Sequence, residues 1–185
     1  RGRRQPRLAL AERSAERLGV VRQRNRGADL ASGEILISLD DDAELPSSRT
    51  VAQTIKAFDD KRIGAVTVPL LQPSHGEMVF QQAPEPVGTW CTFPFIAAAA
   101  AIRRDLWQAA GGYRPNSARR ASEEPDLLWR LLDAGYVCRL GNADPAIHHE
   151  ASAGRDQGAL WRQDVRNELL HSYWYAPSAA LPEQL

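Results

Sequence analysis

The chain has 185 residues, of which 43% are hydrophobic and 25% charged, and this composition is that of an ordinary globular protein of about one domain. It excludes disordered, collagen-like and disulfide-scaffold proteins. Lysine plus arginine and aspartate plus glutamate both number 23, so no net positive field predicts a nucleic-acid partner. The balance conceals a segregation, because residues 1–30 hold nine arginines and three acids, whereas residues 31–60 hold seven acids and two bases.

The first half of the chain alternates predicted helices and strands, in the order helix 8–18, helix 25–33, strand 34–39, helix 47–58 and strand 63–70. Gly19 and Gly33 are placed to end the first two helices, and Ser47 or Ser48 to cap the third. The strand at 34–39 is apolar, which predicts burial on both of its faces. The alternation is typical of βαβ units in an α/β fold.

Prolines and glycines between residues 72 and 94 predict long loops, with one hairpin near residues 78–81. The predicted elements that follow are strand 95–102, helix 104–110 ended by Gly111, polar loop 116–121, helix 122–134 capped by Ser122, strands 136–140 and 146–149, and helix 155–175. In the last helix a stripe of large apolar residues predicts a face that covers the core, namely Trp161, Val165, Leu169 and Tyr173.

Cysteine content and hydropathy predict a cytoplasmic location. Cys91 and Cys138 are too few for a disulfide framework, which favours a reducing compartment. The longest apolar run, at residues 93–102, is about half of what a bilayer span needs, and no signal peptide is visible. We therefore expect no transmembrane segment, and leave open a peripheral contact with the inner face of the plasma membrane.

Three consecutive aspartates, Asp40, Asp41 and Asp42, directly follow the predicted strand 34–39. Like charges this close repel one another, and a divalent cation removes that penalty. Carboxylates suit Mg²⁺ or Mn²⁺, and the carboxyl ends of strands are where open α/β sheets bind ligands. The pattern indicates a metal site, against the alternative of a solvated acidic turn that favours the start of the next helix.

Acidic residues also open the predicted helix 122–134, where Glu123, Glu124 and Asp126 lie in the first turn. The helix dipole favours acids there whatever their function. The functional alternative is that one of these carboxylates is a general base, held in place by a helix whose leucines are anchored in the core.

Two further groups of residues are candidates for ligand binding. His148 and His149 are neighbours on a predicted strand, so they point to opposite faces and at most one of them can serve a given site. One imidazole could join Asp42 on a metal, although a single histidine is more often structural. Arg24 lies in a basic segment at residues 23–27 that could hold a phosphate, although a solvated basic loop is the usual alternative.

Taken in order, these segments resemble glycosyltransferase family 2, whose members are nucleotide-sugar transferases with the GT-A fold. The matching segments are GVVRQRNRG at 19–27, ASGEILISLDDDA at 31–43, RRDLWQAAGGY at 103–113, EEPDLLWRLLDAGY at 123–136 and IHHEAS at 147–152. They resemble, respectively, the family's ARNxG segment, its strand with the DxD motif, its RR…GGF stretch, its helix of the form ED(x)DLxxRLxxxGY and its late His…Ser element.

The resemblance implies metal-dependent transfer of a sugar from a nucleotide-diphosphate sugar to an acceptor hydroxyl with inversion, in cell-wall or polysaccharide biosynthesis. The acceptor would be a glycan or a lipid-linked glycan. The family's base falls on Glu124, where aspartate is more usual, with Glu123 and Asp126 as alternatives. The residues implied for nucleotide-sugar binding are Arg24, Asn25, Asp40 and Asp41. The residues implied as ligands of Mg²⁺ or Mn²⁺ are Asp42, Asp40 and His149 (or His148).

The implied fold is α/β, with a Rossmann-like mixed sheet flanked by helices. Residues 1–152 would be the latter part of the catalytic domain, and residues 153–185 a C-terminal amphipathic helix and tail that pack on it. Nothing in residues 1–24 resembles the family's opening strand and PxYN-type turn. We therefore expect that one βαβ unit is missing and that this chain alone binds UDP or GDP poorly.

Two other functions compete with this interpretation. A truncated or degenerate transferase domain could act as a non-catalytic interaction module. A haloacid-dehalogenase-like phosphatase also places paired aspartates after a strand, but it needs Thr or Val after the pair and a later lysine. Here Ala43 follows the aspartates, and the only lysines are Lys56 and Lys61.

Overall fold

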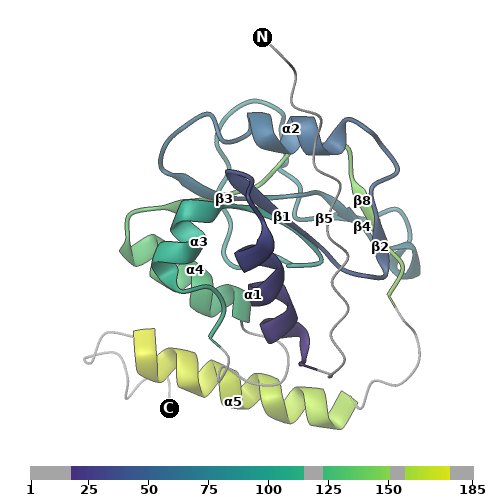
Figure 1. Ribbon diagram of the computed structural model, residues 1–185. Helices are drawn as coiled ribbons and strands as arrows, with labels where there is room; N and C mark the ends of the chain where they lie inside the picture. The colour runs from purple at the N-terminus through teal and green to yellow at the C-terminus, as the bar shows by residue number, and fades with distance from the viewer. Residues whose placement is uncertain (1–17, 115–122, 151–156, 176–185) are drawn as a thin grey trace.

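The computed structural model describes residues 18–114, 123–150 and 157–175, which form two mixed sheets with helices packed around them (Figure 1). The predicted loop 116–121, the cap Ser122 and nearly all of the predicted helix 8–18 lie outside the described residues.

The first sheet has the strand order β1-β6-β3-β7. Its strands are β1 (Ile35–Leu39), β6 (Ala99–Arg103), β3 (Ile63–Thr67) and β7 (Val137–Arg139). β6 is antiparallel to β1 and β3, and β3 is parallel to β7. β3 is buried throughout, but β1 is only partly buried and Leu39 is exposed. The prediction that strand 34–39 is buried on both faces is therefore wrong, because among the described strands β1 pairs on one side only.

The second sheet has the order β2-β8-β4-β5 and lies beside the first (Figure 1). Its strands are β2 (Ala43–Glu44), β8 (Ala146–His148), β4 (Leu70–Leu71) and β5 (Val79–Phe80). β2 follows β1 after three residues and pairs antiparallel with β8, with Ala43 opposite His148. This register brings the end of the acidic segment next to a histidine that lies more than 100 residues later in the chain.

Helices α1 (Val20–Leu30), α2 (Thr50–Lys56), α3 (Arg104–Ala110) and α4 (Glu123–Asp133) surround the first sheet, and a single 3₁₀ turn, η1 (Pro73–His75), follows β4. The prediction for α3 is confirmed at both ends, and Gly111 closes it with φ of 77°. α1 starts five residues earlier than predicted. α2 has no side-chain cap, so the predicted cap by Ser47 or Ser48 is wrong. Ser47 Oγ instead accepts from the backbone N of Arg49, just before the helix, over 3.2 Å and donates to the carboxylate of Asp144.

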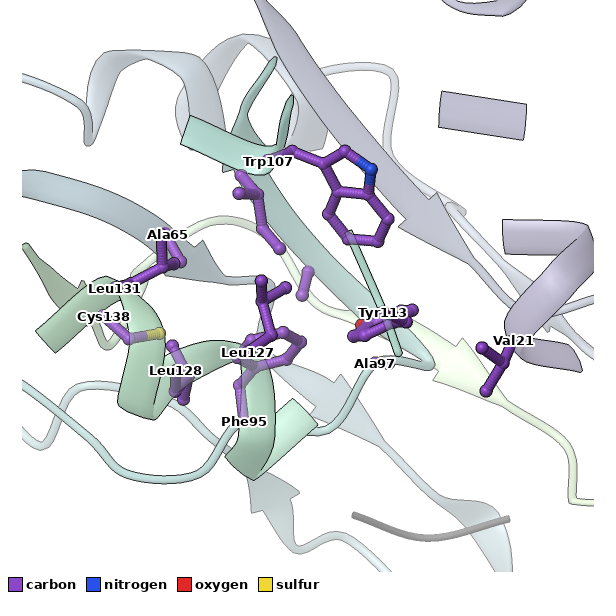
Figure 2. Close-up of a cluster of buried hydrophobic side chains, with 12 residues drawn as sticks. Val21, Ala65, Phe95, Ala97, Trp107, Tyr113, Leu127, Leu128, Leu131 and Cys138 are labelled. Carbon is purple, nitrogen blue, oxygen red and sulfur yellow. The ribbon is translucent and has the colours of Figure 1, made fainter. Parts of the chain in front are cut away.

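The main core lies between the first sheet and helices α1, α3 and α4 (Figure 2). Leu127, Leu128 and Leu131 recur at helical spacing on α4, and all three are at most 2% exposed. Each would cost about 2–5 kcal/mol of stability if cut to alanine, so they fix α4 firmly. The other buried members of this cluster are Val21, Ala65, Phe95, Ala97, Ala100, Ile102, Trp107, Tyr113 and Cys138.

Helix α5 (Gln157–Tyr175) forms where predicted and runs apart from the sheets along the bottom of Figure 1. Its apolar stripe does not cover the core, and that prediction is wrong: the exposed fractions are 73% for Trp161, 53% for Val165, 43% for Leu169 and 67% for Tyr173. Described contacts hold α5 at its C-terminal end, where Tyr175 stacks on Trp129. No helix in the described parts of the chain combines the length and apolarity that crossing a bilayer requires.

Gly141, just after β7, provides a test of this packing. A Cβ at this position would lie 2.2 Å from the carbonyl oxygen of Thr67, which is backbone and cannot rotate away. We expect Gly141→Ala to lower the free energy of unfolding by about 3 kcal/mol. The matched control is Gly27→Ala in α1, where no neighbour lies within 4 Å of the added Cβ; it should raise stability by about 0.5–1 kcal/mol. Chemical denaturation measures both, and equal effects would contradict the packing described.

Candidate functional site

The three aspartates after β1 border a cavity of about 970 Å³, a volume in the range of small-molecule sites. One wall is formed by α1 and β1, and another by residues 95–98 and the start of α4. The titratable side chains that line the cavity are those of Arg24, Asp40, Asp41, Asp42, Tyr113, Glu123, Glu124 and His148. Most of the residues that the sequence singled out therefore meet around one space.

Asp40, Asp42 and His148 form a group suited to a cation. Each offers one ligand atom, and these atoms all lie within 4.8 Å of one another. A backbone turn, in which Ala43 N donates to Asp40 O, folds the aspartates toward β8. Nε2 of His148 lies 3.1 Å from Oδ1 of Asp42. Two carboxylates and one imidazole fit Mn²⁺ well, since carboxylates suit Mg²⁺ and Mn²⁺ and imidazole suits transition metals.

The structure separates the two histidines as strand geometry predicts. His148 is 8% exposed and belongs to the cation group. The side chain of His149 is 57% exposed, and its Nε2 lies 3.1 Å from Oε1 of Glu44, away from Asp40 and Asp42. Asp41 lines the cavity but is exposed and does not belong to the group.

Arg24 of α1 joins the acidic segment to the start of α4. Its Nη2 donates to Oδ1 of Asp40 over 2.5 Å, and its Nη1 donates to Oε1 of Glu123 over 3.2 Å and to Oε1 of Glu124 over 3.4 Å. Burial works against the charged guanidinium, but the hydrogen bond and charge of Asp40 outweigh it, so the pKa of Arg24 is raised. The predicted solvated basic loop is thus replaced at this position by a mostly buried, charge-paired arginine.

Glu124 has the electrostatics of a proton acceptor. Burial, reinforced by the neighbouring carboxylate of Glu123, raises the pKa of Glu124 from 4.5 to about 7, while Arg24 opposes this shift. Glu123 is more deeply buried, with 3% exposed, and its Oε2 has no hydrogen-bond partner among the described residues. A base works best with a pKa near the operating pH, so Glu124 suits that task better than an ordinary surface glutamate would.

Asn25 supports the wall of the cavity and is not part of its lining. Its Nδ2 donates to Tyr113 O over 2.7 Å, and its Oδ1 accepts from Tyr113 N over 2.9 Å. A Cβ on Gly112, whose φ is 64°, would come within 2.9 Å of Oδ1 of Asn25, so the close approach requires glycine. Tyr113 is 1% exposed, and burial raises the pKa of its phenol well above 10.

Asp126 is held in ion pairs and, like Asn25, does not line the cavity. It is fully buried; its Oδ2 accepts from Nη2 of Arg130 over 2.6 Å, and its Oδ1 accepts from Nη1 of Arg114 over 2.9 Å. The hydroxyl of Tyr175 also donates to Oδ1. These contacts tie α4 to α5 and leave the carboxylate committed to structural partners.

Sequence reasoning missed Gln72 and Tyr113. Gln72 is 8% exposed and reaches the ring of His148, and Tyr113 forms part of the cavity wall. For Gln72, the available signal was a polar residue directly after the apolar segment at residues 63–71. The role of Tyr113 depends on a long-range contact with α1, which no local pattern shows.

A family model and two solved structures are similar to this chain. The model of the family described as Glycosyl transferase family 2 matches residues 5–123. Mannosyltransferase PcManGT from Pyrobaculum calidifontis, solved in complex with GDP-Man and Mn²⁺, is similar in structure with a TM-score of 0.61 and 23% identity, over 92% of this chain and 48% of that one. GalNAc-T7, solved with UDP, GalNAc and Mn²⁺, has a TM-score of 0.66 and 15% identity, over 94% and 39% of the two chains. This chain thus spans at most about half the length of either protein. No curated protein sequence matches it.

The raised pKa of Glu124 predicts a pH dependence of stability. The unfolded chain releases the Glu124 proton near pH 4.5 and the native chain near pH 7, so the native state binds the extra proton between these values. The free energy of unfolding should therefore fall as the pH rises through this window, by up to about 1.4 kcal/mol per pH unit. Glu124→Gln should remove this slope, and the exposed-loop control Glu77→Gln should keep it. Denaturation curves of Glu124→Gln that run parallel to those of the unchanged chain from pH 4.5 to 7 would contradict the assignment.

Proposed function

Because the chain belongs to glycosyl transferase family 2 and its fold is GT-A-like, we propose that it carries the catalytic site of an enzyme that transfers a sugar from a nucleotide-diphosphate donor to an acceptor hydroxyl. One observation carries the proposal. The cation group of Asp40, Asp42 and His148 and the proton acceptor Glu124 border the same cavity and are tied together through Arg24.

Asp40, Asp42 and His148 would hold the divalent cation, Mn²⁺ or Mg²⁺. When bound, the cation supplies Lewis-acid stabilisation of the charge that builds up on the leaving diphosphate. The donor set supports this assignment, and both structural neighbours were solved with Mn²⁺. Carboxylates converge here, and that convergence costs electrostatic energy which a cation offsets.

Arg24 and Asp41 would contact the donor. Arg24 is positioned at the cavity wall with its guanidinium already turned toward the acidic segment, where the diphosphate would meet the cation. A guanidinium can exchange a carboxylate for a phosphate oxygen while keeping the same fork geometry. Asn25 would act indirectly, by fixing α1 against the backbone of Tyr113.

Glu124 would be the general base. In a direct displacement, the acceptor oxygen forms a bond to the anomeric carbon while the bond to the diphosphate breaks, and the hydroxyl proton passes to the Glu124 carboxylate. Attack from the face opposite the leaving group inverts the configuration. The pKa of about 7 supports Glu124, and the ion pairs of Asp126 make that alternative less suitable.

The acceptor hydroxyl would belong to a glycan or a lipid-linked glycan.

The non-catalytic interaction module stays the competing function. The catalytic function needs the side chains of the cavity for chemistry, and the interaction module does not. The same variants that test the proposed base and cation ligand also separate these functions.

We expect Glu124→Gln to lower the rate of sugar transfer by about 100- to 10,000-fold while Mn²⁺-dependent binding of the nucleoside diphosphate is retained, because only the proton acceptor is lost. The assay is release of UDP or GDP from a panel of nucleotide sugars, followed by mass spectrometry of the product, with the protein that the full reading frame encodes. Unchanged transfer by Glu124→Gln would rule out its role as the base.

In the same protein as the transfer assay, Asp42→Ala should instead weaken Mn²⁺-dependent binding of UDP or GDP, because it removes a proposed cation ligand. Calorimetry measures this binding. The matched control is Glu44→Ala, which removes an exposed carboxylate two residues away that is outside the cation group. Full transfer activity in both Asp42→Ala and Glu124→Gln would refute the catalytic function of this cavity.

A further inference from the structure

Gln72 lies behind the cation group and contacts it through His148. It directly follows β4, which is the parallel neighbour of β8, and the pairing of Leu71 with Ile147 places Gln72 beside His148. Nε2 of Gln72 lies 3.2 Å from Nδ1 of His148, and each residue is 8% exposed. A buried amide thus faces the ring nitrogen that points away from the aspartates.

The two nitrogens of the His148 ring have different partners. Nδ1 faces the amide of Gln72, and Nε2 faces Oδ1 of Asp42. With the amide nitrogen as donor to Nδ1, the proton of the neutral ring lies on Nε2 and is donated to Asp42. This pair of contacts holds the ring so that Nε2, and not Nδ1, faces the carboxylate of Asp42.

We propose that Gln72 is a positioning residue for the cation site, which sets the orientation of the His148 ring and makes Nε2 its ligand atom. The inference rests on the proposed function, because it assumes that His148 is a cation ligand. A cation at Nε2 requires the lone pair there, so the one proton of the neutral ring is then carried by Nδ1. A half-turn of the Gln72 amide about its last side-chain torsion presents Oε1 as the acceptor for that proton.

Glutamine is suited to this task because its two amide ends serve the two tautomers in turn. A buried Nδ1–H without an acceptor would cost a lost hydrogen bond, so the residue at position 72 affects how well Nε2 can bind. Groups that orient ligating histidines in this way typically change metal affinity by about 10- to 100-fold when they are removed. Gln72 should therefore affect cation binding without touching the cation itself.

The experiment measures binding of Mn²⁺ alone to the 185-residue chain by electron paramagnetic resonance, with nitrogen modulation of the Mn²⁺ signal as the reporter of histidine ligation. Gln72→Met keeps the length of the side chain and removes its hydrogen bonds, so the Mn²⁺ affinity should fall by about 10- to 100-fold and the nitrogen modulation should weaken. Gln72→Glu keeps an acceptor for Nδ1–H, so affinity and nitrogen modulation should be at least those of the unchanged chain.

Three controls separate the possible failures. Gln108→Met makes the same substitution at an exposed site on α3 and should leave Mn²⁺ affinity unchanged. Unfolding temperatures measured with chelator present show whether each variant folds, and if Gln72→Met does not fold, Gln72→Glu decides alone. His148→Ala tests the proposed function itself, since it should abolish the nitrogen modulation.

The outcomes test the cation site and the role of Gln72 separately. If His148→Ala weakens Mn²⁺ binding but Gln72→Met does not, or if Gln72→Glu weakens it, the role of Gln72 is overturned and the cation site stands. If His148→Ala binds Mn²⁺ as the unchanged chain does, or if the unchanged chain binds none, the cation site and the role of Gln72 fall together.

Discussion

The ion pairs of Arg24 are the interaction on which the site depends. One guanidinium joins Asp40, directly after β1, to Glu123 and Glu124 at the start of α4, which lie 99 and 100 residues after Arg24 in the chain. Without this guanidinium, the three carboxylates would face one partly buried space and repel one another. Breaking a buried ion pair by removing one partner typically costs about 3–5 kcal/mol of stability. Asp40 of the cation group and Glu124 are therefore held by the two terminal nitrogens of one guanidinium.

A very short strand pairing completes the arrangement. β2 and β8 share only two residue pairs, yet these set which histidine turns toward the aspartates. Because side chains alternate along a strand, a shift of one residue would exchange His148 for His149 and remove Gln72 from contact with the ring. The parallel pairing of β4 with β8 holds the register from the other side.

Features with a local cause were predictable from the sequence. The ends of α3 follow from its apolar spacing and Gly111, and the burial difference between His148 and His149 follows from strand alternation. The family and the GT-A-like fold followed from the order of several motifs. The predictions that failed concerned burial, which depends on what other elements pack against a strand or helix. The exposed edge of β1 and the exposed stripe on α5 look like core patterns in sequence, because apolar spacing shows which face is apolar and not what lies against it.

The paired hydrogen bonds between Asn25 and Tyr113 make the Tyr113 amide a hydrogen-exchange probe of this cavity wall. The Tyr113 amide donates its proton to Oδ1 of Asn25 on α1, which lies 88 residues earlier in the chain. It can exchange with deuterium only when α1 and the loop after α3 separate. The deuterium-exchange rate of this one amide thus reports the opening of that wall of the cavity in the intact protein.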